Sequence, residues 1–195
     1  MALFQNAWLD KYPGMIDRIG GEFGGGNVSV DPEAMTITID GEETKVDVCN
    51  VIPAMQAGKI AHDAGLTEGD WAPVEPEAMT SKLDPAVHVL GDAAEQGDMP
   101  KSGYSANSQA KVCSNAIVAE LANGRNFPAR YSNTCWSLLG TDDGVKVGAN
   151  YEPADGKITS TGGFISDIGE TDEMRAATYQ ESLGWYAGIT ADMFG

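Results

Sequence analysis

Two Asp-Gly pairs, at residues 40–41 and 155–156, each join two stretches that are rich in β-branched residues. Asp-Gly favours the tight two-residue turn of a β-hairpin, because both central residues of that turn adopt positive φ angles. We therefore predict one antiparallel hairpin within residues 35–52 and a second one formed by residues 145–151 and 157–160.

The first hairpin is predicted to have one solvated face, because isoleucine and threonine alternate along its first strand. Its second strand ends in a more continuous apolar run, Cys49, Val51 and Ile52, which predicts a buried end. A further strand is expected over residues 27–30. The glycine-rich stretch 20–26 before it is predicted to be a loop rather than a dinucleotide-binding fingerprint, since no helix opens after that strand.

Three helices are predicted from apolar residues at helical spacing. A glycine follows the first, a serine can cap the second, and two acids lie in the first turn of the third. They are expected over residues 57–64, over about 103–124 and from 171 onward, whereas residues 126–136 are predicted to be irregular. The apolar stripe of the last helix is expected to comprise Tyr179, Leu183, Tyr186 and Met193, with Trp185 on its flank.

The charge balance excludes several classes of partner. The 195 residues contain 12 Lys+Arg and 29 Asp+Glu, a formal net charge of −17. This charge repels nucleic acid and anionic lipid, and no apolar run is long enough to cross a bilayer. We therefore expect no nucleic-acid binding and no membrane insertion. The acidity has two open explanations, a solvated surface suited to a salty habitat or a face for a basic partner.

The segment with the clearest chemical potential is a predicted short strand, residues 87–90, that ends in Gly91 and Asp92. A helix is expected to begin near Gly103, ten residues later. A carboxylate at such a corner could accept hydrogen bonds from a ribityl hydroxyl, and the free amides of the helix start favour an electron-rich ring edge. The alternative is structural: Asp92 would cap the loop, and the helix would only cover the sheet.

Five segments of the chain resemble the flavoprotein subunit of flavocytochrome c sulfide dehydrogenase, and the resemblance extends in order over essentially all residues. The most specific segments are VHVLGDAA, MPKSGYSANSQAKV, YSNTCWSLL and SLGWYAGITADMFG. A further segment, VCNVIPAMQAGKIAHDAGL, matches the region upstream of these. In the family this stretch is the carboxyl-terminal half, so the resemblance implies a truncated chain whose Met1 stands at an internal position and which lacks the ADP-binding half.

The resemblance implies an α/β fold, part of a glutathione-reductase-like flavoprotein with two dinucleotide-binding domains, plus an α+β carboxyl-terminal domain. Residues 1–50 would be the tail of the NAD-type second domain, with its edge hairpin. Residues 51–125 would return into the FAD-binding domain. Residues 126–195 would form a carboxyl-terminal domain at the flavin and cytochrome interface.

The resemblance also implies roles for particular residues. Cys135 matches one half of a redox-active disulfide whose partner belongs to the absent half, and Trp185 matches an aromatic residue between the flavin and the cytochrome. Asp92 would hold the ribitol, and the backbone of 101–105 would approach the pyrimidine edge of the flavin. The implied cofactor-binding set is Gly91, Asp92, Lys101, Ser102, Gly103, Tyr104 and Ser105.

The other cysteines and both histidines are expected to be structural. Cys113 lies on the apolar face of a predicted helix, where free cysteine is a common core residue, and Cys49 has the same expectation. His62 and His88 show no ligand spacing with cysteine, so no metal site is predicted. The chain has no haem-attachment Cys-x-x-Cys-His sequence, so any haem must come from another chain.

The function that the resemblance implies is FAD-dependent oxidation of sulfide to polysulfide or sulfur in the periplasm, with electron transfer to a c-type cytochrome subunit. The 195-residue chain alone is expected to retain FAD weakly or not at all and to be inactive. Two alternatives stay open. One is a relative of sulfide:quinone oxidoreductase, although the last helix is flanked by acids rather than by the basic residues of a membrane-docking helix. The other is a non-catalytic module that only contacts the cytochrome.

Overall fold

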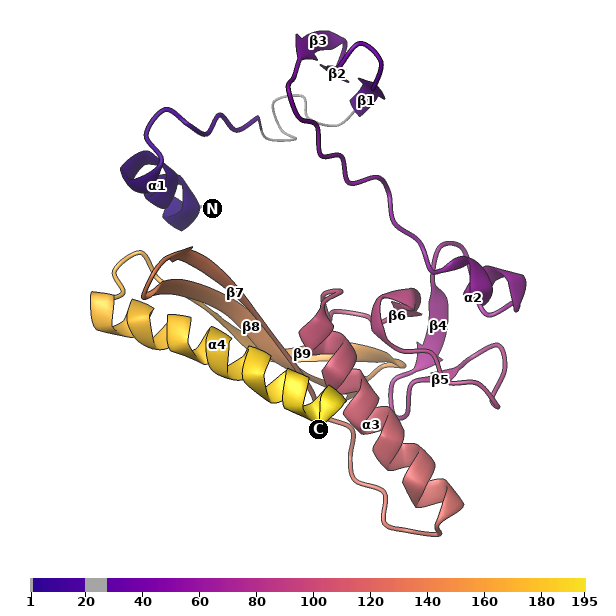
Figure 1. The fold of residues 1–195 in the computed structure, drawn as a ribbon. Coiled ribbons are helices and arrows are strands. Elements are labelled where there is room, and N and C mark those ends of the chain that lie inside the picture. The colour runs from indigo at the N-terminus through magenta and orange to yellow at the C-terminus, as the bar shows by residue number, and fades with distance from the viewer. Residues whose placement is uncertain (1, 20–27) are drawn as a thin grey trace. The chain divides into compact units, whose positions relative to one another are not determined.

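The computed structural model describes residues 2–19 and 28–195. The chain forms two compact units, Met1–Ala54 and Met55–Gly195 (Figure 1). Helices and sheets alternate along it, which confirms the predicted mixture of α and β structure. The assignment of 1–50, 51–125 and 126–195 to domains of a larger flavoprotein stays a prediction.

The first unit contains one helix and one small antiparallel sheet in the order β1-β2-β3. Asp40 and Gly41 turn the chain between the last two strands at φ values of 48° and 90°, which confirms the predicted hairpin. A strand also forms where one was expected after residue 27, whereas the glycine-rich stretch 20–26 lies outside the described residues. The elements are α1 (Ala2–Lys11), β1 (Val28–Asp31), β2 (Thr36–Ile39) and β3 (Glu42–Lys45).

The predicted buried end of the first hairpin is wrong. The last strand ends at Lys45, and residues 46–58 have no regular structure. Ile52 is 78% exposed, and Cys49 is only half-buried. Burial of this run would need a second layer, and no described side chain of this unit is buried.

The second unit begins with a short helix and a three-stranded sheet in the order β5-β4-β6. Gly65, at φ 69°, ends the helix as predicted: its amide donates to the His62 carbonyl at 3.0 Å, and the Leu66 amide donates to the Ala61 carbonyl at 2.9 Å. Strand β6 pairs with β4 in parallel, and β5 pairs with it antiparallel. The elements are α2 (Lys59–Asp63), β4 (Ala72–Glu75), β5 (Thr80–Ser81), η2 (Gly91–Ala93) and β6 (Ala94–Glu95).

The predicted strand at residues 87–90 does not form. His88 makes a single bridge to Thr80, and the Val89 amide donates to the Met79 carbonyl at 3.0 Å. Short apolar runs extend into strands only when a partner continues the ladder, and β5 is only two residues long. Asp92 therefore lies on a short 3₁₀ turn rather than at the carboxyl end of a strand.

The rest of the second unit is a three-stranded antiparallel sheet, in the order β7-β8-β9, with two long helices (Figure 1). Both helices begin as predicted, with Ser102 and Thr171 accepting first-turn amides. Asp155 and Gly156 form the predicted turn of the second hairpin, at φ 51° and 72°. The elements are α3 (Gly103–Leu121), β7 (Tyr131–Gly140), β8 (Asp143–Ala154), β9 (Lys157–Ile165) and α4 (Asp172–Phe194).

Strand β7 corrects the expectation that residues 126–136 are irregular, since it begins at Tyr131. The stripe predicted for α4 is also wrong: Tyr186 is 66% exposed and Met193 is 63% exposed, and Leu183 is 45% exposed. The residues that the sheet covers lie on the adjacent face and include buried Thr178 and half-buried Trp185. Trp185 therefore belongs to the packed face rather than to its flank.

The core of the second unit gathers residues from segments far apart in the sequence. Met79, Tyr131 and Ile158 are each at most 2% exposed, and Cys113 is 4% exposed, which confirms that this cysteine is a core residue. Burial raises the pKa of the Cys113 thiol and that of the Tyr131 hydroxyl. Among the described residues, no helix is both long and apolar enough to cross a membrane.

Candidate functional site

Cys135 lies in β7 and is exposed. Its neighbour Trp136 contacts Trp185 of α4, with ring centroids 5.7 Å apart. Because successive side chains of a strand point to opposite faces, Cys135 points to the sheet face that α4 does not cover. Its register partners on the same face are Val147 and, on the next strand, Ile165, which are 48% and 75% exposed. The sulfur therefore lies in an exposed, largely apolar row.

A buried amide joins this sulfur to the start of α3. Asn133, two residues before Cys135 on the same face, is 3% exposed. Its Nδ2 donates to the Cys135 Sγ at 3.4 Å. Its Oδ1 accepts from the Ser102 Oγ at 2.6 Å and from the Ser105 Oγ at 3.2 Å. The cysteine and the first turn of α3 thus belong to one hydrogen-bonded network.

The first turn of α3 presents free backbone donors. Ser102 Oγ accepts from the amide of Ser105 at 3.0 Å and so caps the third helical residue. Helix geometry leaves the amides of Gly103 and Tyr104 without intrahelical partners. These amides carry the partial positive charge of a helix of 19 residues, which favours an anionic or electron-rich group.

The turn at Gly91 and Asp92 is attached directly to α3. The amide of Gly91 donates to the Oε1 of buried Gln109 at 2.7 Å. Gly91 itself has φ 72°, and a Cβ at this position would lie 3.5 Å from the Cβ of Ala106. Asp92 is exposed beside this contact. The sequence reasoning missed Gln109, although a glutamine four residues before Cys113 in the buried stripe of a helix signals a structural hydrogen bond.

The side chain of Lys101 is hydrogen-bonded to the backbone of this corner. Its Nζ donates to the backbone carbonyls of Asp92 at 2.7 Å and Ala94 at 2.8 Å. It also lies 3.7 Å from the ring centroid of Trp71. Burial lowers the pKa of the Lys101 ammonium, and the nearby carboxylates of Glu95 and Asp92 oppose that shift. The side chain is thus occupied in holding the corner, and only the Lys101 backbone is open to the role predicted for it.

Trp185 lies in an aromatic cluster at the start of α3. Its ring stacks on Tyr104, with centroids 5.7 Å apart and an interplanar angle of 13°. Trp136 completes the cluster, with its ring centroid 6.0 Å from that of Tyr104. The indole nitrogen of Trp136 is buried without a hydrogen-bond partner within the described part of the chain. The sequence reasoning singled out Trp185 but missed Trp136, which lay in the segment expected to be irregular.

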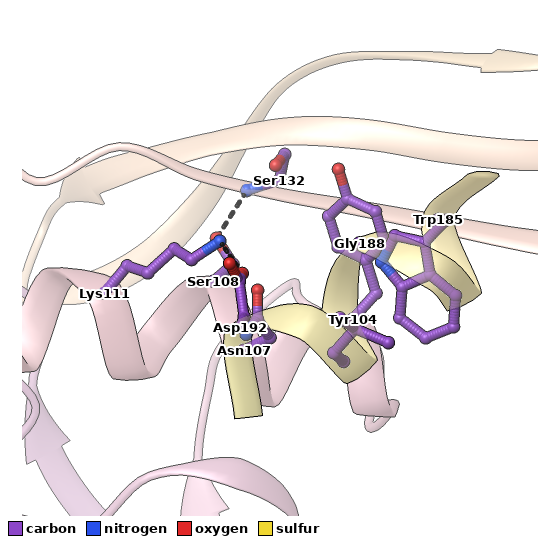
Figure 2. Close-up of a pocket in the computed structure, with 9 residues that line it drawn as sticks. Tyr104, Asn107, Ser108, Lys111, Ser132, Trp185, Gly188 and Asp192 are labelled. Carbon is purple, nitrogen blue, oxygen red and sulfur yellow. Dashed lines mark hydrogen bonds and ion pairs between the residues drawn. The ribbon is translucent and has the colours of Figure 1, made fainter. Parts of the chain in front are cut away.

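A groove of about 260 Å³ lies beside this cluster, between α3, α4 and the start of β7. Figure 2 shows Tyr104 and Trp185 side by side at one end and the ion pair between Lys111 and Asp192, 2.8 Å long, at the other. Between them, the Ser132 amide donates to the Ser108 Oγ at 3.1 Å. The groove is therefore mixed in character, with an aromatic end and a charged end.

The structure thus brings together most of the predicted site residues. Residues 101–105 are the centre of one connected group. Asn133 connects them to Cys135, and Lys101 connects them to the turn at 91–92. Tyr104 connects them to Trp185. The roles that the resemblance implies for them stay predictions. In the described ranges 2–19 and 28–195, no three His, Cys, Asp or Glu residues come together as metal ligands would.

Two family models match the chain. One is described as the central region of the sulfide dehydrogenase (flavocytochrome c) flavoprotein chain and matches residues 1–53. The other is described as flavocytochrome c sulphide dehydrogenase, flavin-binding, and matches residues 127–194. The second match contains β7, β8, β9 and α4, and with them Cys135 and Trp185.

Proposed function

Because the chain belongs to the flavoprotein-chain family of flavocytochrome c sulfide dehydrogenase, we propose that it is part of a flavoprotein that oxidises sulfide and delivers the electrons to a c-type cytochrome subunit. The family is one of flavin-dependent oxidoreductases, and its cofactor is FAD, as the sequence resemblance predicted. The sulfur chemistry, the cytochrome acceptor and a periplasmic location are parts of the proposal.

The observation that carries the proposal is the position of Cys135. Its exposed sulfur is hydrogen-bonded through Asn133 to the first turn of α3, the same turn whose free amides suit an electron-rich ring. A reactive cysteine needs an accessible sulfur beside a group that favours negative charge. Cys113 lacks the first of these conditions because it is buried.

The residues present fit a flavin. The start of α3 offers amides of Gly103 and Tyr104 that helix geometry leaves unpaired, and Asp92 is exposed at the adjoining corner. Asp92 would hold ribityl hydroxyls, and the two amides would hold the pyrimidine edge. A bound flavin supplies the conversion between a two-electron donor and a one-electron acceptor.

Cys135 would form one half of a disulfide whose second cysteine comes from residues outside this chain. Hydrosulfide attacks such a disulfide, so that its S–S bond breaks, a new S–S bond forms in a persulfide, and the other cysteine leaves as a thiolate.

Trp185 supports the proposed direction of electron transfer. It stacks on Tyr104 in the first turn of α3 and so connects the proposed flavin site with α4. The net charge of −17 favours a partner with a basic surface, because complementary charge speeds encounter. An acceptor quinone is less well supported, since α4 has acids in its first turn and no basic residue in its last.

The test is the Cys135→Ser variant of the complete flavoprotein assembled with its cytochrome. We expect sulfide-dependent cytochrome reduction to be abolished, because one sulfur of the proposed pair is gone. The matched control is Cys49→Ser, which removes a half-buried thiol in the other unit and is expected to leave turnover intact. Unchanged turnover in Cys135→Ser would remove this cysteine from the mechanism. If the unsubstituted flavoprotein reduced a quinone but not the cytochrome, the alternative acceptor would be favoured.

A further inference from the structure

Asn133 has a polar side chain in a position that packing alone does not explain. It is 3% exposed, yet it lies on a strand between Tyr131, which is in the core, and Cys135, which is exposed. A buried amide costs free energy unless its donors and acceptors are paired. Here both ends of the amide have partners, and one of them is the cysteine sulfur.

Two hydroxyl groups lie at the oxygen end of this amide. Ser102 Oγ accepts the amide hydrogen of Ser105, and its own hydroxyl donates to Asn133 Oδ1 at 2.6 Å, which is nearer than the alternative acceptor, Ser105 Oγ, at 3.2 Å. Ser105 Oγ lies 3.2 Å from the same oxygen. The structure places the amide with Oδ1 toward the two hydroxyls and with its NH₂ group toward Cys135, where Nδ2 lies 3.4 Å from the sulfur.

We propose that Asn133 is a positioning residue for Cys135, one that donates a hydrogen bond to the sulfur and stabilises the negative charge that forms on it. A hydrogen bond to an ionised acceptor is about twice as strong as one between neutral groups. The Asn133 amide therefore favours the thiolate, which is the nucleophilic and leaving form of a cysteine. The capped start of α3 holds the amide in place. The inference rests on the proposed function, in which one cysteine of the disulfide leaves as a thiolate, and it assigns that leaving role to Cys135.

The experiment follows alkylation of Cys135 by iodoacetamide in the 195-residue chain, resolved from the other two cysteines by peptide mass spectrometry. The main variant is Asn133→Asp, which keeps oxygen acceptors for Ser102 and Ser105 but replaces the donor toward the sulfur with a second oxygen. A carboxylate at the start of a helix is tolerated well. We expect Cys135 to react about tenfold more slowly, the factor that corresponds to the loss of one charge-assisted hydrogen bond.

The other cysteines report whether the fold has loosened. Cys113 is buried, so its alkylation requires local opening, and Cys49 lies in the other unit. Both are expected to react at their wild-type rates. A purely structural role for Asn133 predicts the opposite pattern, with Cys113 reacting faster and Cys135 not slower.

Two further variants complete the test. Asn133→Ala removes the donor without adding charge and is also expected to slow the alkylation of Cys135. If faster alkylation of Cys113 shows that Asn133→Asp loosens the fold, the Asn133→Ala result is the one that tests the inference. Asn150→Asp makes the same change at an exposed position of β8 on the opposite face of the sheet and is expected to leave Cys135 unchanged. The inference would be overturned if Cys135 were alkylated at an unchanged or higher rate in the Asn133 variants. It would also be overturned if Asn150→Asp slowed that alkylation equally. None of these measurements needs sulfide, FAD or cytochrome, so their outcome is separate from that of the turnover test.

Discussion

At the scale of single residues, Gly97 is the described glycine at which an added Cβ would come nearest to another atom. Its backbone has φ 61°, and a Cβ there would lie 2.3 Å from the carbonyl oxygen of Ile158. The next residue, Asp98, continues the contact: its amide donates to that same carbonyl at 2.9 Å, and its carboxylate accepts from the Ser160 amide at 3.1 Å. The segment that carries the Gly91 corner is thereby attached to β9.

Gly97→Ala tests this contact. Its matched control is Gly156→Ala, where φ is 72° but no atom lies within 4 Å of the added carbon. The control is expected to lose about 1 kcal/mol of unfolding free energy from the left-handed backbone alone. Gly97→Ala is expected to lose at least about 2 kcal/mol more, because a backbone carbonyl must move. Urea denaturation measures both values, and equal losses would show that the contact between Gly97 and β9 is not tight.

At the scale of elements, the packing of α4 on the sheet explains why its predicted stripe was wrong. A Cβ on Gly144 of β8 would lie 2.8 Å from the backbone nitrogen of Tyr179, so the helix approaches the sheet backbone at a glycine. Arg175 and Asp143 pair at the same end, with side chains 16% and 18% exposed. Close approach at a small residue and a half-buried ion pair select the helix face, whereas apolarity alone would have selected Leu183 and Tyr186.

Two alanine substitutions of opposite expected sign test that account. Gly144→Ala is expected to destabilise the second unit by about 2 kcal/mol, since the added methyl meets the backbone of α4. Gly184→Ala lies within α4 with open space around it. It is expected to stabilise by about 0.5–1 kcal/mol, because alanine is the better helix former. Urea unfolding followed by far-ultraviolet circular dichroism gives both, and a stabilising Gly144→Ala would contradict the close packing.

At the scale of the whole molecule, stability is concentrated in the second unit. Every buried side chain lies at residue 57 or beyond in the described part of the chain, and the core cluster begins at Val74. The three strands of the first unit leave their side chains exposed or half-buried. Burial of apolar area is the main source of folding free energy, so the first unit has little core of its own, and we expect the second unit to fold without it.

Removal of residues 1–54 tests this separation. We expect the remaining chain, Met55–Gly195, to unfold at the same urea concentration as the second unit of the complete chain, within about 0.5 kcal/mol. Tryptophan fluorescence is a suitable measurement, since Trp136 and Trp185 report on the contact between the sheet and α4. A large loss of stability would show that the two units depend on each other.

The sequence was sufficient wherever a local rule decides the structure. The turns at Asp40-Gly41 and Asp155-Gly156, the serine cap of α3, the start of α4 near Thr171 and the closing Gly65 all form as predicted, because each depends on the φ preference or hydrogen bond of one or two residues. The family resemblance was likewise readable from contiguous segments. Prediction failed where a strand depends on how far its neighbouring strand extends, as for residues 87–90 beside the short β5 and for β7 beside the long β8.

By itself, then, the sequence determined the turns, the helix starts, the flavoprotein family and the residue types of the site. Only the tertiary structure decided that Asn133 connects Cys135 to α3, that Gln109 and Lys101 hold the Gly91 corner, and which face of α4 is covered. The reason is physical: turns and caps arise from neighbours in the chain, whereas these contacts join residues that are distant in sequence and meet only when a common core brings them together.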